Sequence, residues 1–164
     1  MSKYQMVIGR GEPVTFPDLD IHDVPAKTDT GAYRSAVHCT KFKVTTREDG
    51  TEVLKYSLFT GHPCATESEE VETADFKRVV IANSFGHEEE RYEVRLRVKI
   101  GPKIFITPFT LANRGKKIYP ILLGRKFIRG RFLVDVRDSN INRKMLKERY
   151  GIALPEDEEA NDED

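Results

Sequence analysis

Short runs of apolar and β-branched residues, separated by glycine and proline, dominate the hydrophobic pattern of this chain. Such runs are typical of β-strands, and glycine and proline mark the turns between them. The clearest run is residues 90–100, where apolar side chains from Tyr92 to Ile100 occupy every second position. The opposite face, expected to be solvated, carries Arg91, Glu93, Arg95, Arg97 and Lys99. Gly101 and Pro102 then predict a hairpin turn. The pattern predicts strands in residues 4–9, 19–29, 36–46, 52–60, 75–83, 90–100, 103–112 and 119–124.

Many short strands at close spacing favour an all-β barrel or sandwich. Two short helices are expected, one directly after Gly124 over residues 125–130 and one over residues 139–151. Ser139 or Asn140 is the expected N-cap of the second helix. Its apolar side is expected to consist of Ile141, Met145 and Leu146.

The composition fits one polar but foldable domain. The chain has 164 residues, of which 38% are hydrophobic and 33% charged, a balance outside the range of disordered proteins. It has no apolar run near the roughly 20 residues of a membrane span, and residues 1–13 lack the apolar core of a secretory signal. Two cysteines, Cys39 and Cys64, do not form a disulfide framework. These features predict a cytoplasmic protein that does not enter a membrane.

The net charge of zero hides an asymmetry between the body and the C-terminal tail. Residues 156–164 contain seven acids and no Lys or Arg, which leaves 27 basic and 20 acidic residues in the body. We expect a tail of this kind to be disordered, and a body of about +7 favours acidic partners. Alternatively, the tail screens a basic binding surface of its own chain. Its deletion would then raise affinity for acidic peptides, and an unchanged affinity at low salt would contradict this idea.

Asp29 is the first candidate for chemistry, because it follows a strand and precedes Thr30 and Gly31. Alone, this Asp-Thr-Gly sequence is also common in ordinary turns. A carboxylate here can activate water if a second carboxylate shares one proton with it, since like charges about 3 Å apart cannot both ionise. Gly31 would permit a tight turn and the close approach of a second chain.

A second motif, residues 119–136, follows about ninety residues later and runs from an apolar strand through Gly124 and Arg125 into a short helical turn. This pair of motifs resembles the retropepsin-like aspartic proteases. The first motif is matched by Asp29, Thr30, Gly31 and Ala32, and the second by Ile121, Leu122, Leu123, Gly124 and Arg125. The resemblance implies that Asp29, Thr30 and Gly31 are catalytic and that Gly124 and Arg125 support the site.

Three segments together resemble a narrower bacterial and archaeal family labelled "ATP-dependent zinc protease", over roughly residues 7–136. They are residues 26–39, residues 78–91 and residues 119–136. Within them the family pattern is matched by Ala26, Lys27, Asp29 to Ala32, Ser35, Ala36, His38, Arg78, Ser84, Gly86, Glu90 and Arg91. Tyr33 stands where the family often has Lys or Arg.

This resemblance implies peptide or isopeptide hydrolysis in acidic, glutamate-rich tails and a functional link to an ATP-grasp ligase. Arginine binds carboxylates bidentately, so Arg34, Arg78 and Arg91, with Ala32, are the expected substrate-binding residues. The alternative for these arginines is a surface charge or a structural ion pair. Residues 56–73 are expected to cover the site as a flap.

The zinc and ATP labels find no matching motif. The chain has no His-Glu-x-x-His, and neither His38-Cys39 nor His62-x-Cys64 has a recognisable zinc spacing. It also lacks the phosphate-binding loop of many nucleotide-binding proteins. We therefore predict no cofactor and no metal, and assign any ATP dependence to a partner ligase.

The expected fold is mostly β: a retropepsin-like barrel, closed or partly open, with a short helix after Gly124 and a C-terminal helix. Residues 1–137 form the peptidase domain, residues 138–152 the packed helix and residues 153–164 the acidic tail. One chain supplies one Asp29, and Asp135 is assigned a structural role, so the active form is expected to be a homodimer.

Two rival functions stay open. One is a zinc peptidase that uses His38, His62, His87 or the cysteines. The other is a non-catalytic β-barrel that binds acidic peptide or RNA. Nucleic acid is not an expected partner, since no basic strand interleaves the aromatic side chains that stack bases.

Overall fold

The structure is a computed structural model that describes residues 6–82 and 85–151. Residues 4–5 and 83 of the predicted strands, Ser84 of the family pattern and the acidic tail at residues 156–164 lie outside the described residues. The strands are β1 (Met6–Ile8), β2 (Gly11–Phe16), β3 (Ile21–Thr28), β4 (Ala36–His38), β5 (Lys41–Thr46), β6 (Glu52–Ser57), β7 (Val71–Thr73), β8 (Phe76–Ala82), β9 (Glu88–Ile100), β10 (Lys103–Ala112), β11 (Ile121–Leu123) and β12 (Phe132–Val134). The helices are a 3₁₀ turn η1 (Pro17–Leu19), α1 (Arg125–Ile128) and α2 (Arg143–Tyr150).

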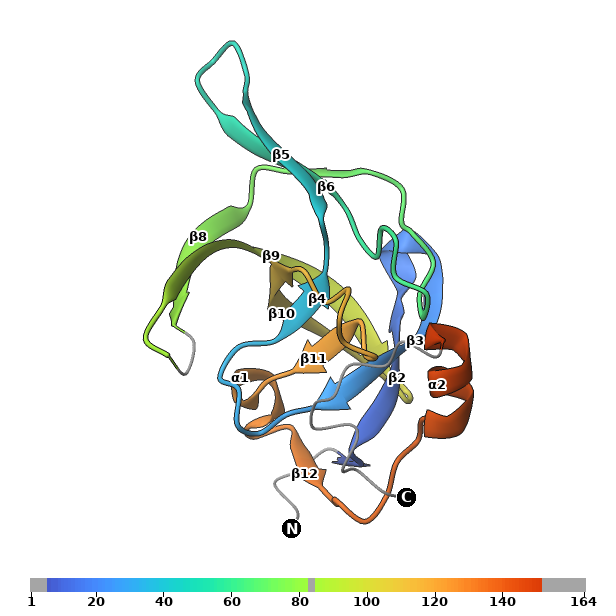
Figure 1. The fold of residues 1–164 in the computed structure, drawn as a ribbon. Coiled ribbons are helices and arrows are strands. Elements are labelled where there is room, and N and C mark those ends of the chain that lie inside the picture. The colour runs from blue at the N-terminus through green and yellow to red at the C-terminus, as the bar shows by residue number, and fades with distance from the viewer. Residues whose placement is uncertain (1–5, 83–84, 152–164) are drawn as a thin grey trace.

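Six strands close into a barrel (Figure 1). Their order is β10-β4-β11-β3-β2-β9, and β9 pairs again with β10, which closes the ring. β8 pairs only with the outer half of β9, so the β8–β9 hairpin extends beyond the ring. The prediction of a mostly β barrel with two short helices is therefore confirmed.

β9 shows why this sequence forms a barrel wall. Val94, Leu96, Val98 and Ile100 are buried, whereas the residues between them are exposed, so the two-residue period separates core from solvent. Gly101, with φ of +57°, makes the turn into β10.

Aromatic side chains fill much of the barrel interior. Phe16 contacts Phe59 at 5.6 Å and Phe109 at 6.3 Å between ring centroids, and all three are almost fully buried. A second cluster, formed by Cys64, Ile118, Tyr119 and Leu146, attaches α2 to the barrel.

α2 begins later than predicted. Its N-cap is Asn142, whose side chain accepts the N–H of Met145 at 3.1 Å, in place of Ser139 or Asn140. Of the expected apolar side, Leu146 is buried but Met145 is 52% exposed. The division into residues 1–137, 138–152 and 153–164 stays a prediction.

The segment expected to be a flap, residues 56–73, is attached to the barrel. Leu58, Phe59, His62 and Cys64 within it are all at most 3% exposed, and the Phe59 N–H donates to the carbonyl of His38 at 2.9 Å. The elements that project instead are the β5–β6 and β8–β9 hairpins (Figure 1). In the described part of the chain, no helix has the length and apolar character needed to cross a membrane.

Candidate active site

The Asp29 loop, residues 29–34, connects β3 to β4 next to β11. The Asp29 N–H donates to the carbonyl of Leu123 at 2.9 Å, which continues the parallel pairing of β3 with β11. Its carboxylate accepts the N–H of Gly31 at 2.9 Å. Asp29 is half-buried, whereas Thr30 and Gly31 are exposed. The loop therefore presents a carboxylate at the surface on a tight turn.

Gly124 allows two main chains to cross beneath this loop. A Cβ at Gly124 would lie 2.5 Å from the carbonyl carbon and oxygen of Arg34 and 2.8 Å from the carbonyl oxygen of Tyr33. Real Cβ atoms do not approach main-chain atoms this closely. The Gly124 N–H also donates to the Ser35 hydroxyl at 3.0 Å. Only glycine fits here without displacing the Asp29 loop.

Arg125 opens α1 and holds the other side of the loop. Its N–H donates to the carbonyl of Ala32 at 2.7 Å, and its Nη1 donates to the carbonyl of Thr30 at 3.0 Å. Lys126 follows, with its N–H donating to the carbonyl of Tyr33 at 2.9 Å. The start of α1 therefore binds three main-chain carbonyls of the Asp29 loop.

Tyr33 is surrounded by cations. Tyr33 is 44% exposed. The centroid of its ring lies 5.8 Å from Arg34 Cζ, 5.6 Å from Arg125 Cζ and 6.0 Å from Lys126 Nζ. The quadrupole of an aromatic face attracts cations at such distances. Sequence reasoning noted Tyr33 only as a departure from the family pattern and missed Lys126, whose proximity depends on the fold.

Arg34 is held by Glu93 of β9. Its Nη1 donates to Glu93 Oε2 at 2.7 Å, and the Glu93 side chain is only 8% exposed. The alternation along β9 predicted an outward-facing Glu93. The structure buries it because Arg34 supplies the compensating charge.

Arg78 and Arg91 lie on the β8–β9 hairpin. Arg78 pairs with both carboxylate oxygens of Glu52 on β6 at 3.3 Å, which raises its pKa. Arg91 pairs with Glu89 at 3.2 Å. Of the three arginines expected to bind substrate, Arg34 lies in the Asp29 loop, and each of the three already faces a carboxylate of its own chain.

Asp135, the other aspartate considered, has a structural role. Both of its carboxylate oxygens bind the Arg137 guanidinium, at 3.0 and 2.8 Å, which lowers the pKa of Asp135 to about 2. Its N–H donates to the carbonyl of Ile8 at 2.8 Å and extends the pairing of β12 with β1.

His38 is buried, and both of its ring nitrogens are engaged by the main chain. Nδ1 accepts the N–H of Arg114 at 2.9 Å, so the proton lies on Nε2, which donates to the carbonyl of Thr60 at 2.9 Å. Burial lowers its pKa, which favours the neutral ring.

His62 repeats this arrangement 5.2 Å away, measured between ring centroids. Its Nδ1 accepts the N–H of Cys64 at 3.1 Å, and its Nε2 donates to the carbonyl of Lys117 at 2.9 Å. Burial lowers its pKa to about 4. Neither histidine has a nitrogen lone pair available for a metal.

The remaining donors do not fit a zinc site either. Burial raises the pKa of both Cys39 and Cys64 to about 11, which favours the protonated thiol, whereas zinc binds thiolate. His87 is exposed next to β9. Across residues 6–82 and 85–151, no three His, Cys, Asp or Glu residues are grouped as metal ligands.

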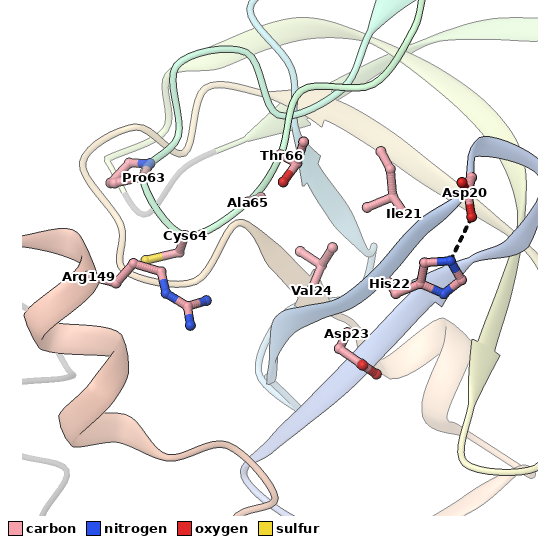
Figure 2. Close-up of a pocket in the computed structure, with 10 residues that line it drawn as sticks. All are labelled: Asp20, Ile21, His22, Asp23, Val24, Pro63, Cys64, Ala65, Thr66 and Arg149. Carbon is pink, nitrogen blue, oxygen red and sulfur yellow. Dashed lines mark hydrogen bonds and ion pairs between the residues drawn. The ribbon is translucent and has the colours of Figure 1, made fainter.

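A cavity of about 510 Å³ lies between β3, the segment around Cys64 and α2 (Figure 2). His22 and Asp20 pair with each other at 2.8 Å on the β3 side of the cavity, and Arg149 approaches from α2 on the other side. None of the predicted site residues lines it, so it is separate from the Asp29 loop.

Relatives of this chain carry ligase names. It is 28% identical over 155 residues to a Desulfotalea psychrophila protein named "Probable alpha-L-glutamate ligase", and 30% identical over 142 residues to a Shewanella pealeana protein of the same name. These alignments cover 93% and 85% of this chain but only 32% and 30% of the relatives. The chain therefore spans about a third of the length of the curated relatives it matches.

Among solved structures, the chain resembles the crystal structure of Lpg0085, a protein with unknown function from Legionella pneumophila. The TM-score is 0.65 at 26% identity, and the match covers 82% of this chain and 96% of that one. The barrel is therefore shared over nearly the whole of the solved chain.

The family comparison covers the whole site described above. Residues 7–145 match the family described as retropepsin-like aspartic endopeptidase RimB. This span includes the Asp29 loop, β11 and α1. The chain belongs to the RimB-like family of retropepsin-like aspartic endopeptidases.

Proposed function

We propose that this protein is an aspartic peptidase that hydrolyses peptide or isopeptide bonds by means of Asp29. The observation that carries the proposal is the Asp29 carboxylate, held half-buried on a tight turn by Gly31, in a chain of a retropepsin-like family. Thr30 and Gly31 complete the catalytic loop, and Gly124 and Arg125 support it from below.

The proposed active form is a homodimer. Two carboxylates must share a proton, and the chain has one Asp-Thr-Gly sequence. Asp135 is bound to Arg137 by both oxygens, so it does not supply the second carboxylate. A two-fold axis next to the exposed Thr30 and Gly31 would bring two Asp29 residues together, one from each subunit.

In this mechanism, the ionised Asp29 of one subunit takes a proton from water while the protonated Asp29 of the other donates a hydrogen bond to the scissile carbonyl. Attack of the water oxygen on the carbonyl carbon gives a neutral tetrahedral diol, as the second carboxyl passes its proton to the carbonyl oxygen. Transfer of a proton to the amide nitrogen then breaks the C–N bond and releases an amine and a carboxylic acid.

Acidic, glutamate-rich tails are the proposed substrates. Support comes from the names of the longer relatives, which describe ligases for glutamate: such a ligase forms an amide bond, and the proposed peptidase would hydrolyse one. The excess of basic residues outside residues 156–164 also favours an acidic substrate. We further propose that a glutamate ligase, of the ATP-grasp type, is the functional partner.

The test is hydrolysis of a glutamate-tailed peptide, in excess chelator, by wild type, by Asp29→Asn and by the matched control Asp18→Asn. Asp18 is an exposed residue of η1 paired with Arg97 at 3.5 Å. We expect wild type and Asp18→Asn to cleave at similar rates, and Asp29→Asn to lose at least about a thousandfold in kcat. Cleavage by Asp29→Asn would contradict the proposal.

The same experiment separates the rivals. Loss of wild-type activity in chelator would favour a zinc peptidase, although the buried, main-chain-bonded histidines do not fit one. Salt-dependent binding of the peptide without cleavage by wild type would favour the non-catalytic barrel.

A further inference from the structure

A cavity of about 450 Å³ lies between the first turn of α1 and the base of the β8–β9 hairpin. We call it the α1–β8 cavity. It is lined by Asp75, Phe76, Lys77, Glu93, Arg95, Pro108 and Lys126. A smaller hollow that contains Arg34 and Ser35 adjoins it and shares Glu93, Pro108 and Lys126 with it.

The α1–β8 cavity lies beside the Asp29 loop. The Asp29 N–H bonds to Leu123, and the chain then passes Gly124 and Arg125 to reach Lys126, whose own N–H bonds back to Tyr33 of the loop. An extended peptide advances about 3.3 Å per residue. A substrate whose scissile bond lies at Asp29 would therefore reach the cavity within a few residues of that bond.

Cations outnumber carboxylates around the cavity. Arg95 pairs with Asp75 at 3.5 Å, and Glu93 is taken by Arg34 at 2.7 Å. Two cations of the lining remain, Lys77 and Lys126. Within residues 6–82 and 85–151, neither forms an ion pair with a carboxylate, and the Lys126 ammonium lies 6.0 Å from the centroid of the Tyr33 ring. The two lysines come from different elements and line the same cavity.

The cavity also has an apolar side, formed by Phe76 and Pro108. A glutamate side chain has the matching shape, because its methylene groups pack on apolar surface while its carboxylate receives charge-assisted hydrogen bonds. A neutral or basic side chain would leave the two ammonium groups without an anion.

We propose that the α1–β8 cavity is the pocket for an acidic side chain of the substrate, and that Lys77 and Lys126 determine its specificity. This inference rests on the proposed function, which places the substrate across the Asp29 loop. It assigns selectivity to two residues of β8 and α1 in addition to the arginines suggested by the sequence.

The experiment measures binding without cleavage, in the Asp29→Asn background. Hexaglutamate and hexaglutamine peptides are each titrated against three proteins. The first carries Asp29→Asn alone, and the second, the cavity variant, also carries Lys77→Gln and Lys126→Gln. The third, the control variant, carries Asp29→Asn with Lys116→Gln and Lys144→Gln. The control removes the same charge from exposed positions outside the cavity. We expect the Lys77/Lys126 variant to weaken hexaglutamate binding at least about tenfold, and the control to weaken it less than about twofold.

Hexaglutamine separates selectivity from general binding. Its dissociation constant should be nearly the same in all three proteins. Three results would overturn the inference. The cavity and control variants could weaken hexaglutamate binding equally, or the cavity variant could weaken the binding of both peptides equally. The third result is that hexaglutamate does not bind at low salt. Failure of wild type to cleave, with selective binding intact, would overturn only the proposed hydrolysis. Thermal unfolding of each variant checks that it is folded.

Discussion

At the scale of single residues, the site depends on close approaches that leave no room for substitution. Gly124 passes so near the main chain of Arg34 and Tyr33 that a Cβ would overlap their atoms. The contact is to main chain, which cannot rotate away as a side chain can. The position of the Asp29 loop is therefore coupled to a residue that takes no part in chemistry.

The variant Gly124→Ala should lose about 3 kcal/mol of unfolding free energy, because the main chains must separate to admit the methyl group. Urea unfolding monitored by circular dichroism measures this loss. Gly115→Ala is the control, because a Cβ there would approach side-chain atoms alone, Asn113 Oδ1 at 3.1 Å and His38 Cε1 at 3.8 Å. If both variants lose the same small amount, the close packing at Gly124 is not a constraint.

Arg34 and Glu93 should behave as a coupled pair. Arg34→Met leaves the buried Glu93 carboxylate without its cation and should cost about 3 kcal/mol of stability. Adding Glu93→Gln should recover much of that loss. Denaturant unfolding of the wild type, two single variants and the double variant gives the coupling free energy, and additive losses would show that the pair is not coupled.

The sequence was sufficient to single out Asp29 and Gly124, because both lie in short motifs that together resemble those of the retropepsin-like proteases. It was not sufficient for Glu93 or Lys126. Glu93 is buried against an arginine 59 positions away, and its place on an alternating strand predicted the opposite face. Contacts that form only when the barrel closes cannot be predicted from the alternation of polar and apolar residues along one strand.

At the scale of elements, two buried histidines join the segment after β6 to the barrel and to α2. His62 lies 6.0 Å from the Tyr150 ring, and the Tyr150 hydroxyl donates to the carbonyl of Gly115 at 2.6 Å. Since both histidine rings donate to and accept from main-chain groups, protonation would break one hydrogen bond at each. The docking of α2 is therefore sensitive to acid.

Stability should fall as the pH drops from about 6.5 towards 4. The pKa of His62 is about 4 in the folded protein, lowered from 6.5 by burial. Between these pH values the unfolded chain binds a proton at His62 that the folded chain does not. His62 therefore lowers the free energy of unfolding by about 3 kcal/mol as the pH falls from 6.5 to 4. The lowered pKa of His38 adds in the same direction.

Urea unfolding at steps between pH 7 and pH 4 measures this slope. His62→Gln should flatten it, because glutamine takes up no proton in this pH range. An unchanged slope in His62→Gln would show that other groups account for the acid sensitivity.

The sequence predicted which elements exist better than where they begin or what they cover. The hydrophobic pattern located most strands and both helices, but it missed β2 (Gly11–Phe16) and did not separate β4 from β5. α2 begins at Arg143, and residues 56–73 are anchored by buried side chains, where a flap was expected. Whether a loop projects or packs depends on which cavity of the barrel its few apolar residues fill.

At the scale of the whole molecule, the proposed dimer makes a quantitative prediction. If each active site needs one Asp29 from each subunit, equal amounts of wild type and Asp29→Asn, allowed to exchange subunits, should retain about a quarter of the wild-type activity at the same total concentration. Independent monomers would retain about half. Peptide hydrolysis after mixing, with sedimentation to verify the dimer, distinguishes the two outcomes.

The long-range contacts of the Asp29 loop also bear on when the loop forms during synthesis of the chain. Its supports are distant in the chain: Gly124 bonds to Ser35 across 89 residues, and Arg125 bonds to Thr30 across 95. Contacts of such separation form late in folding, and a ribosome adds about 5–20 residues per second. The Asp29 loop therefore takes its final shape only after β11 and α1 have been synthesised, when most of the barrel is already present.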